Sequence, residues 1–286
     1  MKNELGDRMK DYEQRTRSML PRRSNIMIRI DGKSFHTYTK GLNKPFDFGL
    51  MEDMAETTKY LCSKIQGAKM GYTQSDEISI LLTDYDSYRT DAWFNGQVQK
   101  IVSVAASMAT NKFNSLRLIR MLEERDSDML DVIESIKNLT GAEFDARVYT
   151  LPDGEEVVNY FIWRQQDATR NSISMAAQAY FSHKELQNVN TGKMQDMLMT
   201  QKEINWNDYP VIAKRGWAVK RQEQEWVRPK DNKSWKPRKV ISLDDCPADA
   251  IMFKRNAWEI DREMPILTKD REYVLNVLPQ RKELWK

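Results

Sequence analysis

The segment AKMGYTQSDEISILL, residues 68–82, decides the predicted fold because an apolar alternation starts directly after its polar centre. Beyond that centre, alternate positions are apolar: Ile78, Ile80 and Leu82. Alternation with a period of two is typical of a half-buried strand. The segment therefore predicts a β-hairpin with its turn around residues 73–76. The turn leaves two adjacent carboxylates, Asp76 and Glu77, at the start of the second strand, where their repulsion needs a cause.

A second strand is predicted upstream, at NIMIRIDG, residues 25–32. Its isoleucines at 26, 28 and 30 share one face, whereas Arg29 and Asp31 lie on the other. A slip of one residue would bury Arg29 and Asp31, so the pattern also predicts the register. Gly32 ends the strand directly after the aspartate.

The order of the predicted elements indicates an α+β fold. A strand at 25–32, a helix at 49–66, the hairpin at 68–82, a helix at 96–120 and a strand at 144–152 follow one another. This is the order of a split β-α-β, ferredoxin-like unit. We expect its helices to cover one face of the sheet and to leave the other face free for chemistry.

Further elements are predicted around this core, with a β and loop extension at the C-terminus. They are a helix at 3–19, an acidic helical insertion at 120–138, a helix at 155–182, a hairpin at 209–221 turning through Lys214–Gly216, and a helix at 268–278. We divide the chain into a catalytic domain, residues 1–150, and a C-terminal helical and basic hairpin region, residues 151–286, for substrate and RNA binding.

Composition excludes several classes of protein. The 286-residue chain has a net charge of +3 and only two cysteines and two histidines, which excludes a disulfide framework and a metal site built from cysteine or histidine. The charged N-terminus has no apolar core of a signal peptide, and no run of 18 apolar residues occurs. We therefore expect a cytoplasmic protein without membrane contact.

The carboxylates of the two predicted strands suggest a cation site. In a split β-α-β unit the first strand and the hairpin are neighbours, so Asp31 and the pair Asp76–Glu77 meet at one edge of the sheet. Clustered carboxylates repel one another unless a cation neutralises them. All-oxygen ligation favours Mg²⁺ or Mn²⁺. Two such ions would stabilise the attacking and leaving oxygens of a phosphoryl or nucleotidyl transfer.

The stretch DGKSFH, residues 31–36, supports this interpretation. Gly32 permits close backbone approach, and the turn after it can point successive N–H groups at an anion. Positive charge comes from Arg29, Lys33 and Lys44. The alternative is an ordinary glycine turn beside a surface aspartate.

Three neighbouring residues each fit two roles. Glu77 either supports the cation site or is a structural ion-pair partner of Arg29. Ser75 either contacts a nucleotide or hydrogen-bonds its own turn. Arg147, on the strand FDARVYTLP, either faces the site or is a solvated strand arginine.

Two further stretches could contact a substrate. WRQQDATRNS, residues 163–172, places Arg164, Asp167 and Arg170 at intervals of three, which is either an ion-paired helix face or a phosphate-binding one. Residues 214–239 contain ten Lys or Arg and three acidic residues, interleaved with tryptophans. This composition suits RNA backbone and unstacked bases, or else a charged hairpin whose tryptophans pack on the domain.

Together these motifs resemble the tRNA-histidine guanylyltransferase superfamily of 3′-to-5′ nucleotide polymerases. The resemblance covers roughly residues 25–221. It runs through RIDGKSFHTYTKGLNKPFD, GYTQSDEISILL, SVAASMATNKF, FDARVYTLP, YFIWRQQDATRNSI and, more loosely, YPVIAKRGWAVKR. It implies a polymerase-palm-like core, and the stretch Arg170-Asn171-Ser172 looks most like the guanylyltransferase-like proteins of bacteria, archaea and phages.

The resemblance also implies roles for individual residues. Asp31 and Asp76 would hold two Mg²⁺ ions with help from the Gly32 carbonyl, and Glu77 would support them. A nucleotide triphosphate would contact Arg29, Gly32, Lys33, Ser34, Phe35, His36, Lys44 and Ser75. The RNA or a second nucleotide would contact Arg147, Arg164, Asp167, Arg170, Asn171, Lys214 and Arg215.

The implied function is template-dependent addition of nucleotides to the 5′ end of tRNA after activation with ATP. GTP and other nucleoside triphosphates would be substrates, and the resemblance suggests a homotetramer. The alternative within the same family is a tRNA-histidine guanylyltransferase that adds an untemplated guanosine. A palm-type nucleotide cyclase and an RNA-binding module without activity also fit parts of the pattern.

Overall fold

The computed structural model describes residues 4–123, 141–229, 238–239 and 250–279. Its helices are α1 (Glu4–Gln14), α2 (Phe35–Tyr38), α3 (Phe48–Lys64), α4 (Val98–Glu123), α6 (Gly154–Tyr180), α7 (His183–Leu186), α8 (Thr191–Lys202), α9 (Val211–Arg215) and α10 (Glu272–Leu275). Its strands are β1 (Asn25–Gly32), β2 (Ala68–Gln74), β3 (Glu77–Thr83), β4 (Phe144–Leu151), β5 (Trp217–Pro229), β6 (Arg238–Lys239) and β7 (Ala250–Asp261).

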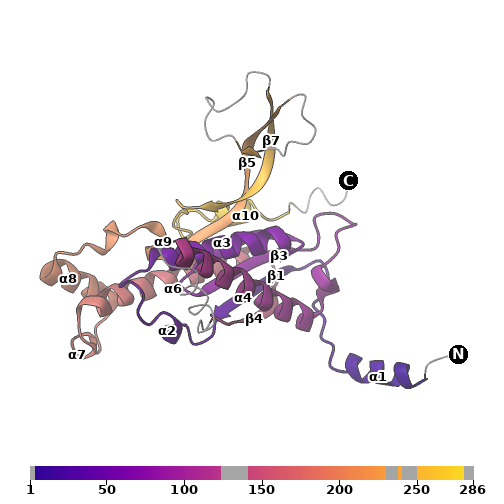
Figure 1. Cartoon of the computed structure of the whole chain (residues 1–286), viewed down its shortest axis with the longest axis horizontal. Helices are drawn as coiled ribbons and strands as arrows, with labels where there is room; N and C mark the ends of the chain where they lie inside the picture. Colours follow the sequence, from indigo (N-terminus) through magenta and orange to yellow (C-terminus); the bar gives the residue numbers. More distant parts are fainter. Residues whose placement is uncertain (1–3, 124–140, 230–237, 240–249, 280–286) are drawn as a thin grey trace.

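The central sheet confirms the predicted split β-α-β unit. Its strands follow the order β4-β1-β3-β2-β5-β6, and the pairs within the split unit are antiparallel. Helix α3 connects β1 to β2, and α4 leads from β3 toward β4 (Figure 1). The first four strands in this order are those of the ferredoxin-like arrangement, so sequence alternation was sufficient to predict the topology.

The register places acidic residues side by side at one end of β1. Asp31 lies opposite Glu77 on β3 and opposite Asp145 on β4. The β2–β3 turn is closed by two residues, Ser75 and Asp76, and Ser75 has a left-handed φ of 50°. The backbone N–H of Gly32 donates to the carbonyl of Asp76 at 3.1 Å, which ties this turn to the end of β1.

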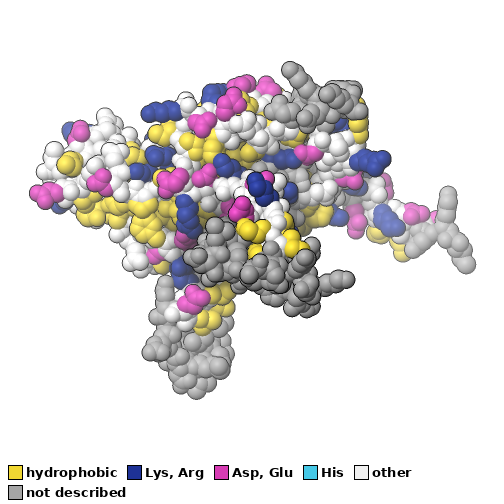
Figure 2. Space-filling model, turned by 90° about the horizontal axis from the view of Figure 1, so that it is seen from above, with side chains coloured by type: hydrophobic (Ala, Val, Ile, Leu, Met, Phe, Trp, Pro, Cys, Tyr) yellow, Lys and Arg dark blue, Asp and Glu magenta, His cyan; other side chains and the backbone are white. Residues whose placement is uncertain are grey.

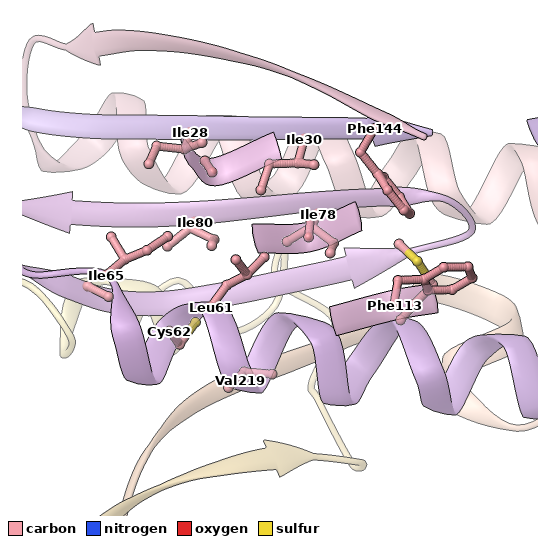
Figure 3. Close-up of a cluster of buried hydrophobic side chains, with 14 of the residues drawn as sticks. Ile28, Ile30, Leu61, Cys62, Ile65, Ile78, Ile80, Phe113, Phe144 and Val219 are labelled. Atoms are coloured by element: carbon pink, nitrogen blue, oxygen red, sulfur yellow. The ribbon is translucent and has the colours of Figure 1, made fainter. Parts of the chain in front are cut away.

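Helices α3 and α4 cover one face of the sheet and bury the main core. The isoleucines of β1 and β3 face Leu61 and Cys62 of α3 and Phe113 of α4 in a cluster of buried side chains (Figure 3). Val219 of β5 belongs to the same cluster. This burial supplies the main stabilising free energy of the layer, because it removes apolar surface from water.

The second face of the sheet is not free, which corrects the sequence-based expectation. Helix α6 covers part of it, with Val157, Tyr160 and Phe161 buried against Met27 and Leu81 of the sheet, among others. The reason lies in the sequence of this second face, which carries large apolar side chains as well as polar ones. Its serine, Ser79, is buried and forms a 2.7 Å hydrogen bond with the Tyr160 hydroxyl.

The C-terminal elements differ most from the prediction. Residues 211–215 form helix α9 instead of one arm of a hairpin, and Gly216, with φ of 76°, ends the helix. Strand β5 pairs with β2, so the central sheet continues past the proposed domain boundary at residue 150. Strand β7, which the sequence did not predict, pairs with β5 along its whole length, and the β5–β7 ribbon extends away from the body (Figure 1).

Two helices are shorter than the sequence predicted. Helix α1 stops at Gln14 instead of residue 19, and α10 spans only Glu272–Leu275 of the expected 268–278. Helix α4 takes in the first residues of the acidic insertion, and residues 124–138 of that insertion lie outside the described residues. Within the described parts of the chain, no helix is long and apolar enough to cross a membrane.

Candidate active site

The carboxylates that the sequence singled out lie at the end of β1 and in the β2–β3 turn. Asp31 is the penultimate residue of β1, and Asp76 directly precedes β3. The antiparallel pairing of β1 with β3 brings them together, although 45 positions separate them in the sequence. This confirms that the two motifs meet at one edge of the sheet.

Glu77 forms the ion pair with Arg29 that was one of its two expected roles. Its side chain is 6% exposed, and Arg29 Nη2 lies 2.6 Å from its Oε2. Arg164 Nη1 lies 2.9 Å from Oε1 and 2.8 Å from Oε2. Burial raises the pKa of Glu77, while the hydrogen bonds and charge of Arg164, and the charge of Arg29, oppose this shift. Guanidinium groups therefore engage both carboxylate oxygens.

Among the described residues, Asp31 and Asp76 lack the close ion pairs that Glu77 forms. The ion pairs of Asp31 within the described chain are long, with Arg29 Nη2 at 3.4 Å and Arg147 Nη2 at 3.9 Å. Burial raises the pKa of Asp76, and the nearby charge of Asp31 raises it further, although a hydrogen bond from Ser75 works against both. Two neighbouring carboxylates whose negative charges are not fully neutralised by protein cations are typical of a cation site.

This donor set fits a divalent cation that prefers oxygen. In the part of the chain that the structure describes, no group of three or more His, Cys, Asp or Glu side chains is arranged to hold a metal. The pair Asp31 and Asp76 would therefore need further oxygens from the backbone, water or substrate phosphates. Mg²⁺ in proteins is commonly held by one or two carboxylates with substrate phosphates, so a pair of carboxylates suits this ion.

The turn after Gly32 is anchored by one buried aromatic side chain. Ser34 has a left-handed φ of 50° and begins the short helix α2. Phe35 is 6% exposed, and its ring centroid lies 5.0–5.8 Å from those of Tyr38, Phe113 and Phe144. This packing holds the backbone of the turn against the core.

A cavity of about 740 Å³ lies beside this turn. This size is within the range of about 300–1,000 Å³ typical of small-molecule sites. The expected site residues that line it are Gly32, Ser34, Phe35, His36, Lys44, Ser75, Asp76 and Asn171. The carboxylate site and the cavity thus share Gly32 and Asp76.

The opposite wall of the cavity was not predicted. It comes from one face of α6, at positions Ala168, Asn171, Ser172, Met175, Gln178 and Ala179, and from Ile212, Ala213 and Gly216 around α9. The α6 residues recur at intervals of three and four, which places them on one side of a helix. This spacing is the signal that could have found them, but small and apolar residues at such intervals usually mark a core.

Several expected site residues lie outside this lining. They are Arg29, Asp31, Lys33, Glu77, Arg147, Arg164, Asp167, Arg170, Lys214 and Arg215. The Lys33 ammonium pairs with Glu143 at 2.6 Å and stays exposed. The Lys214 ammonium hydrogen-bonds the carbonyl of Asn207, and burial together with the charge of Arg215 lowers the pKa of Lys214.

The expected charged face of α6 is an ion-paired face. Arg164 Nη2 lies 2.9 Å from Asp167 Oδ2, and Arg170 Nη2 lies 3.0 Å from Asp167 Oδ1. Arg164, expected as a substrate contact, is instead buried, whereas Arg170 is 55% exposed. Of the neighbouring motif, Asn171 lines the cavity, and the buried Ser172 accepts a 3.0 Å hydrogen bond from the Trp206 indole.

The described tryptophans of the basic stretch 214–239 both contact arginines of this chain. Trp217 is 7% exposed and lies under the guanidinium of Arg262 at 4.4 Å. The guanidinium of Arg255 lies 5.1 Å from the ring centre of Trp226. On the face that Figure 2 shows, basic and acidic side chains are interspersed and form no single basic surface.

Comparison with known proteins identifies the class. A family model described as tRNAHis guanylyltransferase matches residues 6–152. A bacterial tRNA(His) guanylyltransferase-like protein, solved in complex with ATP, matches with a TM-score of 0.75 and 46% identity over 96% of this chain and 100% of that chain. Such a protein in complex with GTP gives a TM-score of 0.70 and 44% identity over 96% and 99%. The tRNA(His) guanylyltransferase of Debaryomyces hansenii is 26% identical over 245 residues, 79% of this chain and 86% of the relative.

A palm-like split sheet with paired carboxylates beside a nucleotide-sized cavity, together with these matches, defines a nucleotidyltransferase. More particularly, the chain belongs to the tRNAHis guanylyltransferase family, because the family model covers half of it and the bacterial relative nearly all of it. The resemblance found in the sequence is thereby confirmed.

Proposed function

We propose that this protein adds a nucleotide to the 5′ end of tRNA, and that guanosine addition to histidine tRNA is its activity. The names of its relatives favour this reaction over the template-dependent repair that the sequence suggested first. Repair remains the second candidate, because Arg170-Asn171-Ser172 resembles the motif of the bacterial, archaeal and phage proteins. A homotetramer is part of the same proposal.

One observation carries the proposal: the cavity that fits a nucleotide shares Asp76 and Gly32 with the carboxylate site. A triphosphate in that cavity would lie within reach of the turn at Ser34–His36 and of Lys44. The base would then contact the α6 wall. Bacterial relatives were solved with ATP and with GTP, which supports purine nucleoside triphosphates as ligands of this cavity.

Asp31 and Asp76 would hold divalent cations, and Mg²⁺ is the ion we expect. When bound, such ions neutralise phosphate charge and stabilise the attacking and leaving oxygens of nucleotidyl transfer. The 5′-phosphate of the RNA first attacks the α-phosphorus of ATP, the bond between the α- and β-phosphates breaks, and pyrophosphate departs, which leaves AMP joined to the RNA 5′-phosphorus. The 3′-OH of the incoming nucleotide then attacks that phosphorus, the bond to the AMP leaving group breaks, and AMP departs. Glu77, Arg29 and Arg164 take no part in bond making and keep the carboxylates in place.

The test uses a 5′-monophosphorylated histidine tRNA transcript, ATP, Mg²⁺ and each labelled nucleoside triphosphate in turn. We expect label from GTP at the 5′ end with the unaltered protein and none with Asp76→Ala. Asp145→Ala is the matched control, since this exposed carboxylate lies opposite Asp31 but outside the cavity, and it should retain activity. A cyclic nucleotide as the product would instead support a nucleotide cyclase, and no reaction would support the inactive RNA-binding module.

A second substrate set separates guanosine addition from repair. It consists of tRNA lacking its first nucleotide, with each of the four bases placed opposite the gap. Guanosine incorporation regardless of the opposing base, with preference for intact histidine tRNA, supports the proposed function. Incorporation that follows Watson–Crick pairing with the opposing base supports repair and overturns the guanosine assignment.

A further inference from the structure

Six charged side chains of alternating sign connect the carboxylate site to the surface of α6. In order they are Asp31, Arg29, Glu77, Arg164, Asp167 and Arg170. Every link lies within ion-pair distance, from 2.6 Å between Arg29 and Glu77 to 3.4 Å between Arg29 and Asp31. The chain therefore contains three positive and three negative groups, so its charges balance.

Arg164 is the buried centre of this chain. Its side chain is 3% exposed, one Nη contacts both oxygens of Glu77, and the other contacts Asp167. The ring of Trp163 covers its guanidinium, with the centroid 3.7 Å away. A guanidinium offers its donors in a rigid planar fork, so these contacts fix the orientation of Glu77 as well as its charge.

Two buried donors in this chain of charged side chains lack a hydrogen bond within the described structure. The Nε atoms of Arg29 and Arg164 are buried and have no hydrogen-bond partner among the residues that the structure describes. An unsatisfied buried donor costs about 1–3 kcal/mol, so each of these two atoms lowers the free energy of unfolding. What the arrangement provides is a guanidinium at Arg29 that contacts both Glu77 and Asp31.

We propose that Arg164 is a positioning residue of the transfer site: through Glu77 and Arg29 it sets the position of Asp31. The proposal rests on the proposed function only for its assumption that Asp31 holds a divalent cation. Arg164 itself does not line the cavity. Removing it leaves Glu77 with one guanidinium, which frees Glu77 to draw Arg29 away from Asp31.

The same protein contains a matched control. Asp53, which is 3% exposed, is also held by two arginines, with Arg117 Nη1 at 3.0 Å and Arg120 Nη2 at 2.8 Å. This trio joins α3 to α4, and its three members do not line the cavity. Arg120→Met therefore leaves a buried carboxylate with one arginine, as Arg164→Met does, but outside the transfer site.

The experiment measures binding of Mn²⁺ alone by electron paramagnetic resonance, with the unfolding temperature recorded for every variant. We expect Arg164→Met to weaken Mn²⁺ binding about tenfold or more, the usual cost of losing a group that orients a metal ligand. Arg164→Lys keeps the charge without the fork and should recover part of the affinity. Arg120→Met should lower the unfolding temperature and leave Mn²⁺ affinity unchanged.

Equal Mn²⁺ affinities in the unaltered protein and in folded Arg164 variants would overturn the proposal. An equal loss in Arg120→Met would overturn it too, since the effect would then follow general destabilisation. If Arg164→Met does not fold, the Mn²⁺ affinity of Arg164→Lys is compared with that of the unaltered protein instead, and equal affinities overturn the proposal. Arg164-dependent Mn²⁺ binding by a protein that adds no nucleotide to tRNA would uphold this proposal and overturn the proposed function.

Discussion

The ring of Phe35 occupies the space that a side chain at Gly32 would need. A Cβ atom at Gly32 would overlap the Phe35 ring, which is itself packed against Tyr38, Phe113 and Phe144. Position 32, beside the carboxylate site, must therefore be glycine because the Phe35 ring is packed against it. Site geometry and the aromatic core therefore depend on the same contact.

Gly32→Ala should damage both stability and nucleotide binding. The added methyl must displace the ring or the turn, and overpacking of this kind costs about 1–3 kcal/mol. We expect a lower free energy of unfolding in urea and weaker ATP binding in calorimetry. Gly192→Ala is the control, because its Cβ would meet only Asn190 Oδ1 at an ordinary 3.4 Å on α8. Unchanged ATP affinity in Gly32→Ala would show that the turn does not contact the nucleotide.

Asp31→Ala and Asp76→Ala should each abolish nucleotide addition without unfolding the protein. Loss of a metal-holding carboxylate should cost at least the ~10–100-fold seen when a supporting group is lost. Removal of either charge also relieves the mutual repulsion that acts on Asp76. The measurements are turnover with Mg²⁺ as the only divalent ion and circular dichroism. Near-normal turnover in either variant contradicts the assigned site.

Strict alternation explains which parts of the fold the sequence could predict. β1, the β2–β3 hairpin and β4 were found within a residue or so, because one face of each carries regularly spaced apolar residues. β7 has charged residues among its apolar ones, such as Lys254 and Glu259, so neither of its faces carries regularly spaced apolar residues. Without such alternation the local pattern does not indicate a strand, and β7 was therefore missed.

One glycine accounts for the error at α9. Gly216 has a left-handed φ of 76°, which both a hairpin turn and the end of a helix require. A five-residue helix is too short to display a period of 3.6, so the local sequence could not separate the two. The cavity wall was missed for a different reason, because Ala168 and Ala179 of α6 have side chains without reactive or charged groups.

Arg170→Ala should weaken the use of tRNA or nucleotide while leaving metal binding intact. The side chain is 55% exposed beside Asn171, which lines the cavity, and its pairing with Asp167 would contribute only about 0–1 kcal/mol to stability. We expect a higher KM for one substrate, because an exposed arginine can bind phosphate with two donors. Arg15→Ala removes a similar exposed pair with Asp11 and serves as the control. Unchanged KM and kcat would mean that Arg170 only pairs on the surface.

Asp261, at the end of β7, should make stability depend on pH through contacts that fasten the ribbon to the body. Burial alone would raise its pKa, but a 2.7 Å hydrogen bond from the Tyr273 hydroxyl and the ammonium of Lys220 at 3.2 Å outweigh burial and hold the pKa below its ordinary value. A carboxylate with a lowered pKa stabilises the folded state above the pKa it has when unfolded, about 3.9. This stabilisation disappears as the pH falls through the folded-state value.

Asp261→Asn should therefore lower the free energy of unfolding at pH 7 by about 1.5–3 kcal/mol, the scale of hydrogen bonds to a charged group. The difference from the unaltered protein should shrink as the pH falls below the unfolded pKa of about 4. Urea unfolding at several pH values measures it. Glu223→Gln, which breaks an exposed pair with Lys254 on the same ribbon, should leave stability nearly unchanged at every pH. A deficit in Asp261→Asn that stays constant from neutral to acidic pH would mean that packing, and not the charge of Asp261, holds this end of β7.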